Sequence, residues 1–223
     1  MLLEKVISIV ALSAALLDGS MKTALPDKAI DGNVFLINRQ NVVSRYYAPE
    51  TRKVIGPGMS QTMREDAASA LEAMFAAAKD EGINLAIVSG YRSYSKQSTI
   101  YSRKKSSMGQ AEADRISARP GASEHQLGLV MDIARKGSSQ LNTKFGTTAE
   151  GKWVAENAHR FGFIIRYLED YEHVTGYMYE PWHVRYVGTE HAKRLFECGL
   201  PMEMYMSGFK LEVYDYLIHQ DYE

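Results

Sequence analysis

The sequence predicts one α+β domain in which helices flank a small central antiparallel sheet. The chain has 223 residues, of which 45% are hydrophobic and 24% are charged, and this suits a globular domain with a core of its own. Short apolar runs typical of strands are mixed with longer segments of helical spacing. Because a parallel sheet would need regular strand–helix–strand units, the irregular order favours the α+β class.

The first 32 residues are expected to lie outside this domain, which we place at residues 33–223. Residues 6–17 form an apolar run that is short for a bilayer span, and residues 18–32 have the Asp, Gly and Pro content of a linker. The run has two interpretations. As a signal peptide or anchor, it predicts an exported or envelope-associated protein that contacts the membrane through this segment. The acidic Glu4 beside Lys5 instead favours a helix that packs on the domain.

Within the domain, the first predicted elements are a short edge strand, a long helix and a buried strand. Residues 34–38 have the character of a short strand, and residues 84–89 form a buried strand that ends at Gly90. Ser60 is a suitable N-cap for a helix that ends near Asp80. The apolar face of this helix is expected to comprise Met63, Ala67, Leu71, Met74, Phe75 and Ala78.

The rest of the domain continues the mixed order. Helices are predicted at 95–105, 148–161 and 189–198, and strands at 128–134, 163–166 and 183–187. The polar residues with recognisable chemistry fall at the ends of these strands or in the loops beside them. We therefore expect the functional site in a cleft on the sheet.

Charge and cysteine content exclude several classes of function. The formal net charge is −1, so there is no global basic field and we expect no binding to nucleic acid. Cys198 is the only cysteine, which rules out an intrachain disulfide and a cysteine-based metal site.

Two histidines and one aspartate have the character of a zinc site. His125, Asp132 and His183 offer the imidazole and carboxylate donors that Zn²⁺ accepts, and three protein ligands leave one position open for chemistry. A straight strand would separate His125 from Asp132 by roughly 23 Å, so the chain has to bend between them. Gly128 is the natural bend point.

Glu180 lies three residues before His183 and supplies a spare carboxylate. Pro181 disfavours a regular strand between them, so we expect a turn that delivers both side chains to one cleft. Two roles are open to Glu180. It can take a proton from water and pass it to a leaving amine, or it can orient a metal ligand.

Arg92 directly follows the strand predicted at 84–89. Its guanidinium is suited to grip a substrate carboxylate or a developing oxyanion, and the alternative is a surface ion pair. Gln97 and Ser123 can add neutral hydrogen bonds to a bound substrate.

These residues also carry a resemblance to a known group of enzymes. The Ser-x-His-x6-Asp pattern that begins at Ser123 and the Glu-x-Trp-His pattern that begins at Glu180 resemble those of the LAS zinc peptidases. This group includes lysostaphin, D-alanyl-D-alanine peptidases and sonic hedgehog. The run Ser-Gly-Tyr-Arg-Ser at 89–93, with Gln97 beyond it, and the run at 33–39 are similar to VanY-like D,D-carboxypeptidases.

The resemblance covers roughly residues 33–200 and departs from the family pattern at Val130, where the family usually has alanine. It implies a zinc metallopeptidase that removes the C-terminal D-alanine from peptidoglycan stem peptides of the cell wall. Glu180 would then carry protons, and Arg92 would stabilise negative charge.

Three alternatives stay open at this point. The chain can be an L,D-carboxypeptidase, an endolysin-like endopeptidase, or a zinc-stabilised binding module without turnover. A carboxypeptidase needs an anchor for a free carboxylate, and an endopeptidase needs a cleft that is open at both ends. The presence of Glu180 argues against the inactive module.

Overall fold

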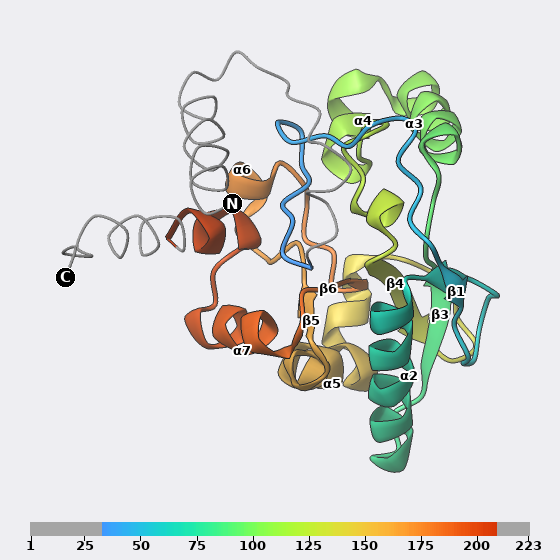
Figure 1. Cartoon of the computed structure of the whole chain (residues 1–223), viewed down its shortest axis with the longest axis vertical. Helices are drawn as coiled ribbons and strands as arrows, with labels where there is room; N and C mark the ends of the chain where they lie inside the picture. The colour runs from blue at the N-terminus through green and yellow to red at the C-terminus, as the bar shows by residue number, and fades with distance from the viewer. Residues whose placement is uncertain (1–32, 209–223) are drawn as a thin grey trace, which may run out of the picture.

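The computed structural model describes residues 33–208 of the chain (Figure 1). The apolar run at 6–17, with its two interpretations, therefore lies outside the described residues. No helix in the described part of the chain is long and apolar enough to cross a membrane.

A four-stranded antiparallel sheet forms the centre of the fold, with the strand order β3-β4-β6-β5. These strands are β3 (Leu85–Ser89), β4 (Val130–Arg135), β5 (Phe163–Ile165) and β6 (His183–Tyr186). A second, two-stranded sheet pairs β1 (Arg52–Lys53) with β2 (Thr62–Met63). Small antiparallel sheets surrounded by helices confirm the predicted α+β class.

The helices lie around the sheet (Figure 1). The α-helices are α2 (Glu65–Asp80), α3 (Tyr94–Met108), α4 (Gln110–Ile116), α5 (Ala149–Asn157), α6 (Glu172–Thr175) and α7 (Thr189–Cys198). The 3₁₀ turns among residues 33–208 are η2 (Glu124–Leu127), η3 (Thr143–Thr147) and η4 (Ala158–Phe161). Helices α3 and α4 pack against each other at one end of the molecule, and α5 and α7 lie toward the other end.

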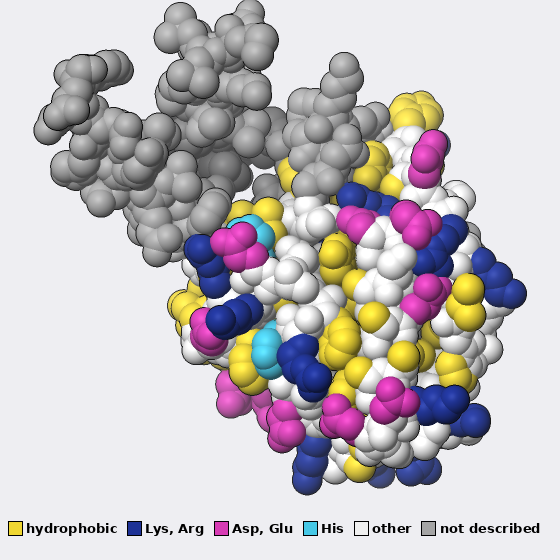
Figure 2. Space-filling view, turned by 60° about the horizontal axis from the view of Figure 1, so that its bottom comes forward, with side chains coloured by type: hydrophobic (Ala, Val, Ile, Leu, Met, Phe, Trp, Pro, Cys, Tyr) yellow, Lys and Arg dark blue, Asp and Glu magenta, His cyan; other side chains and the backbone are white. Residues whose placement is uncertain are grey.

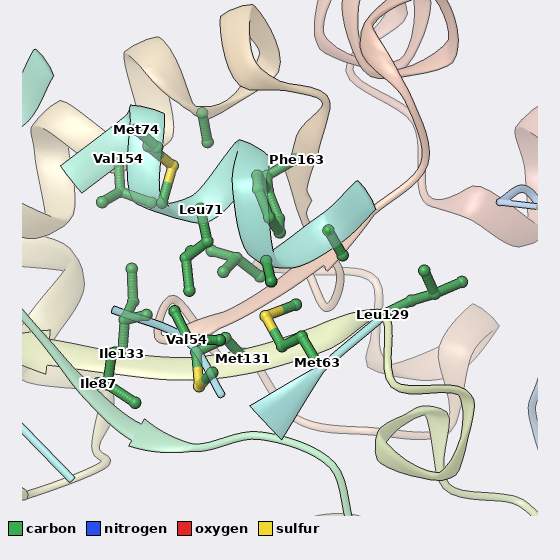
Figure 3. Packing of buried hydrophobic residues seen from close by; sticks show 14 of the residues in the cluster. Val54, Met63, Leu71, Met74, Ile87, Leu129, Met131, Ile133, Val154 and Phe163 are labelled. Atoms are coloured by element: carbon green, nitrogen blue, oxygen red, sulfur yellow. The ribbon is translucent and has the colours of Figure 1, made fainter. Parts of the chain in front are cut away.

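The hydrophobic core lies between α2 and one face of the sheet. Figure 3 shows Leu71 and Met74 of α2 facing Met131 and Ile133 of β4, with Phe163 of β5 beside them. All five side chains are almost completely buried. Each such burial contributes about 1.5–3 kcal/mol, so the sheet is held firmly against the helix. Side chains alternate across a strand, so Asp132, which lies between Met131 and Ile133, points away from this core.

One predicted element is absent from the structure, and another begins later than predicted. Residues 34–38 form no strand, because the carbonyls of Asn33 and Phe35 accept hydrogen bonds from Arg185 Nη2 instead of a neighbouring strand. The long helix begins at Glu65 rather than after Ser60, because residues 62–63 pair with β1. In both places a long-range contact overrides the local signal.

Figure 2 shows one face of the molecule, on which basic and acidic side chains are interspersed. Several of the exposed charges form ion pairs, such as Arg115 Nε with Glu172 Oε1 and Arg194 Nη2 with Glu190 Oε1 at 2.8 Å. Exposed pairs of this kind contribute little to the free energy of unfolding, about 0–1 kcal/mol each.

Candidate metal centre and active-site cleft

The predicted bend between His125 and Asp132 is present at Gly128. This glycine has φ 69° and ψ 15°, a left-handed conformation that ends η2 and starts the chain toward β4. A Cβ at Gly128 would also lie 3.2 Å from the Thr51 side chain and 3.3 Å from that of Arg64. The turn therefore returns the chain onto the sheet, close to His125.

The sheet register places the other two candidate ligands side by side. Asp132 on β4 is paired directly with His183 on β6, and opposite residues of an antiparallel pair share one face. Their side chains meet, with Asp132 Oδ1 3.1 Å from His183 Nδ1, and Asp132 Oδ2 lies 3.4 Å from His125 Nε2. All three side chains are buried, and one ligand atom from each lies within 4.8 Å of the others.

The hydrogen bonds of the two imidazoles suit metal binding. His125 Nδ1 lies 2.7 Å from the Gly90 carbonyl oxygen, to which it donates, so Nε2 keeps its lone pair toward Asp132. Burial lowers the pKa of His125 to about 4, and Arg92 acts in the same direction, so this imidazole is neutral at neutral pH. Burial also lowers the pKa of His183, but the hydrogen bond to Asp132 and the nearby carboxylates of Glu124 and Glu180 outweigh it and raise this pKa to about 9. The carboxylates thus favour a cation at this point, and the donor set fits Zn²⁺.

Glu180 lies beside the three candidate ligands, in the turn that leads into β6. The turn predicted around Pro181 is present, because His183 N donates to the Glu180 carbonyl oxygen at 3.0 Å. The Glu180 carboxylate lies 3.6 Å from His183 Nδ1, with its side chain 13% exposed. Burial raises the pKa of Glu180 to about 7, with His183 lowering it and Asp132 raising it. A carboxyl group with this pKa can both accept and release a proton near neutral pH.

Arg92 reaches the same cleft from the end of β3. Its Nη1 donates to Gln97 Oε1 at 2.8 Å, and its Nη2 donates to Asp132 Oδ2 at 3.4 Å. Its Nε is buried and has no hydrogen-bond partner among the described residues. Gln97 donates its amide nitrogen to the Ala118 carbonyl oxygen at 2.6 Å, so both ends of the Gln97 amide are engaged within the protein, one of them on Arg92. Ser123 is buried and lines the cleft.

The cleft itself has a volume of about 470 Å³, which is within the usual range for a small-molecule site. All seven predicted site residues line it, together with aromatic and basic side chains that the sequence did not single out for a role. Lys104, Tyr167 and Trp182 belong to this second group. Tyr167 packs against His183, with ring centroids 4.9 Å apart.

Glu124 is the most consequential residue that the sequence reasoning missed. It is completely buried and lies between the cleft and two buried arginines, Arg166 and Arg185. Burial raises the pKa of the Glu124 carboxyl, but the two arginines outweigh burial and hold this pKa well below its ordinary value. Its place directly before His125 was the only local signal, and that signal does not reveal burial.

Comparison with known proteins identifies the class. The model of the VanY family, D-alanyl-D-alanine carboxypeptidase, matches residues 60–189, and the chain belongs to this family. YodJ of Bacillus subtilis (strain 168) is 44% identical over 183 residues, which cover 78% of this chain and 67% of YodJ. The chain spans about two thirds of the length of the curated relatives that it matches.

Two solved structures are similar to this one. The LdcB LD-carboxypeptidase has a TM-score of 0.73 and 43% identity, over 77% of this chain and 84% of LdcB. A mutant of the vancomycin-resistance D,D-pentapeptidase VanY, in complex with Zn(II), has a TM-score of 0.68 and 34% identity, over 78% of this chain and 98% of that protein.

Proposed function

We propose that this chain is a zinc-dependent D,D-carboxypeptidase that removes the C-terminal D-alanine from peptidoglycan stem peptides. The observation that carries the proposal is the meeting of His125, Asp132 and His183 beside the Glu180 carboxylate in one cleft. Membership of the VanY family and the zinc complex of the related VanY support it. Because such a substrate lies in the cell envelope, we also propose an exported or envelope-associated location, with residues 1–32 as the candidate signal or anchor.

His125, Asp132 and His183 would hold the metal. When bound, zinc lowers the pKa of a water molecule and polarises the scissile carbonyl. Glu180 accepts a proton from the attacking water and returns it to the leaving amine, for which a pKa near neutrality is suited. The guanidinium of Arg92 offers Nε and its neighbouring N–H groups to negative charge on the substrate or on the developing tetrahedral centre.

A second candidate is an L,D-carboxypeptidase, which would act on tetrapeptide stems. The similarity to the LdcB LD-carboxypeptidase favours it. Both candidates use the same ligands, base and carboxylate anchor, so they differ in the stereochemistry of the residue before the scissile bond rather than in the metal site.

Arg92→Lys tests whether the enzyme recognises a free chain end. Lysine keeps the positive charge but loses the planar fork, so we expect kcat/KM on a free-acid peptide to fall by about 10- to 100-fold. Amidating the substrate C-terminus should lower the wild-type rate strongly and the variant's rate much less, if Arg92 grips the carboxylate. The measurement is a pair of steady-state rates, on free and amidated peptides, for each protein.

Two other outcomes of these rate measurements would change the role of Arg92 or the class of peptidase. Similar losses of the variant on both substrates would assign Arg92 to the oxyanion at the scissile bond. Equal wild-type rates on free and amidated peptides would reject a carboxypeptidase and favour an endopeptidase.

A further inference from the structure

Glu124 is shared between two buried arginines through only one of its carboxylate oxygens. Its Oε1 accepts from Arg166 Nε at 2.8 Å and from Arg185 Nη1 at 2.8 Å. The side chains of Glu124, Arg166 and Arg185 are 0% exposed. The arginines are themselves fixed, because Arg166 forms two further bonds to Glu203 and Arg185 donates to backbone carbonyls at the start of the domain. The position of Glu124 is therefore set from the side remote from the cleft.

The second oxygen of Glu124 faces the candidate metal ligand His183. Glu124 Oε2 and His183 Nε2 lie 3.6 Å apart, and neither has a hydrogen-bond partner among the described residues. This distance is longer than a hydrogen bond. Buried polar atoms nearly always have a hydrogen-bond partner. We therefore infer that Glu124 Oε2 and His183 Nε2 form a hydrogen bond once a small movement of the His183 imidazole brings them closer.

The opposite edge of the same imidazole points into the metal site. His183 Nδ1 is the atom that lies against Asp132 and Glu180. A neutral imidazole carries its proton on one nitrogen only, so a proton on Nε2 leaves the lone pair of Nδ1 for a metal. The group that accepts a hydrogen bond from Nε2–H therefore determines that Nδ1 is the nitrogen available to bind the metal.

We propose that Glu124 is a positioning residue for the metal site, which accepts the Nε2–H of His183 and so keeps Nδ1 as the ligand atom. Carboxylates in this place orient the ring and strengthen the ligand. The proposal rests on the proposed zinc site but concerns a residue that does not contact substrate or metal. The two arginines take part in this positioning, because their hydrogen bonds to Oε1 fix the carboxylate in place and leave Oε2 toward His183.

Glu124→Gln is the sharpest test, because the two side chains have nearly the same shape. Glutamine has one acceptor oxygen, whereas the native residue serves the arginines with one oxygen and His183 with the other. The two arginines should donate to that single oxygen. The glutamine amide nitrogen would then face the Nε2–H of His183, and because both groups are donors, no hydrogen bond could form between them. We expect zinc affinity to fall by about 10- to 100-fold, measured by competition with a coloured chelator.

Glu203→Gln is the matched control. This substitution also removes a carboxylate partner of Arg166, but Glu203 does not contact His183. The variant should therefore lower thermal stability without lowering zinc affinity. Equal zinc affinity in wild type and Glu124→Gln would overturn the proposal. Equal weakening by both variants would also overturn it, since a general loss of packing would then be the cause. If wild-type protein binds no zinc, the proposed function itself fails, and this outcome is distinct from the others.

A measurement on wild-type protein avoids any folding defect of the variant. In zinc-loaded protein, long-range ¹H–¹⁵N correlation spectra report which nitrogen of each histidine carries a proton. The proposal predicts a proton on Nε2 of His183, protected from exchange with water. The absence of a proton on His183 Nε2, or a ¹⁵N chemical shift of Nε2 typical of a zinc-bound nitrogen, would refute the proposal.

Discussion

We expect His183→Ala to lose bound zinc and turnover together. His183 is one of three protein donors that converge in the cleft, and a catalytic zinc site needs three. Without this imidazole, only His125 and Asp132 would hold the metal. We expect less than stoichiometric zinc after dialysis and no measurable hydrolysis, tested by elemental analysis and a peptide assay on the same sample.

His173→Ala is a suitable control for this experiment. His173 is exposed on α6, where its Nδ1 lies 3.1 Å from the Asp170 carbonyl oxygen. This variant should keep zinc and activity. Full zinc occupancy in His183→Ala would remove His183 from the ligand set.

Glu180→Gln separates chemistry from metal binding. The amide keeps the shape of the side chain but does not accept a proton, so we expect zinc to be retained while kcat falls by about 10²- to 10⁴-fold. Single-turnover rates measured on fully loaded protein would show the loss. Glu169→Gln, an exposed change earlier in the chain, should leave the rate unaltered.

If Glu180→Gln instead keeps a rate near that of wild type, Glu180 only orients His183 and another group must accept the proton. A loss of zinc that parallels the loss of rate would point to the same conclusion. The 3.6 Å between the Glu180 carboxylate and His183 Nδ1 makes this alternative worth excluding.

Local signals were enough to predict the parts of the site that depend on a few neighbouring residues. The bend at Gly128 could be predicted because His125 and Asp132 can share a metal only if the chain turns between them. The left-handed backbone found there is a conformation that glycine adopts readily. The turn before His183 follows from Pro181 in the same way. The convergence of His125, Asp132 and His183 was predicted from their types and spacing, and the sheet register now gives its physical basis.

Long-range contacts account for what the sequence did not predict. Glu124 bonds to arginines 42 and 61 residues away in the chain, and only the folded structure brings them together. The strand predicted at 34–38 is absent for the same reason, since Arg185 donates hydrogen bonds to the carbonyls of Asn33 and Phe35. Ser60 has the local chemistry of an N-cap, but pairing of β2 with β1 delays the helix to Glu65.

Product analysis tests most directly whether this protein is a zinc-dependent enzyme that removes a single terminal residue. Purified protein would be incubated with pentapeptide, tetrapeptide and intact muropeptides, with and without a chelator, and the products read by mass spectrometry. The proposal predicts loss of one D-alanine from the pentapeptide, abolished by the chelator and restored by added zinc. Removal from the tetrapeptide alone would assign the L,D activity instead. Cleavage at an internal bond, or turnover that the chelator leaves unchanged, would contradict the proposed function.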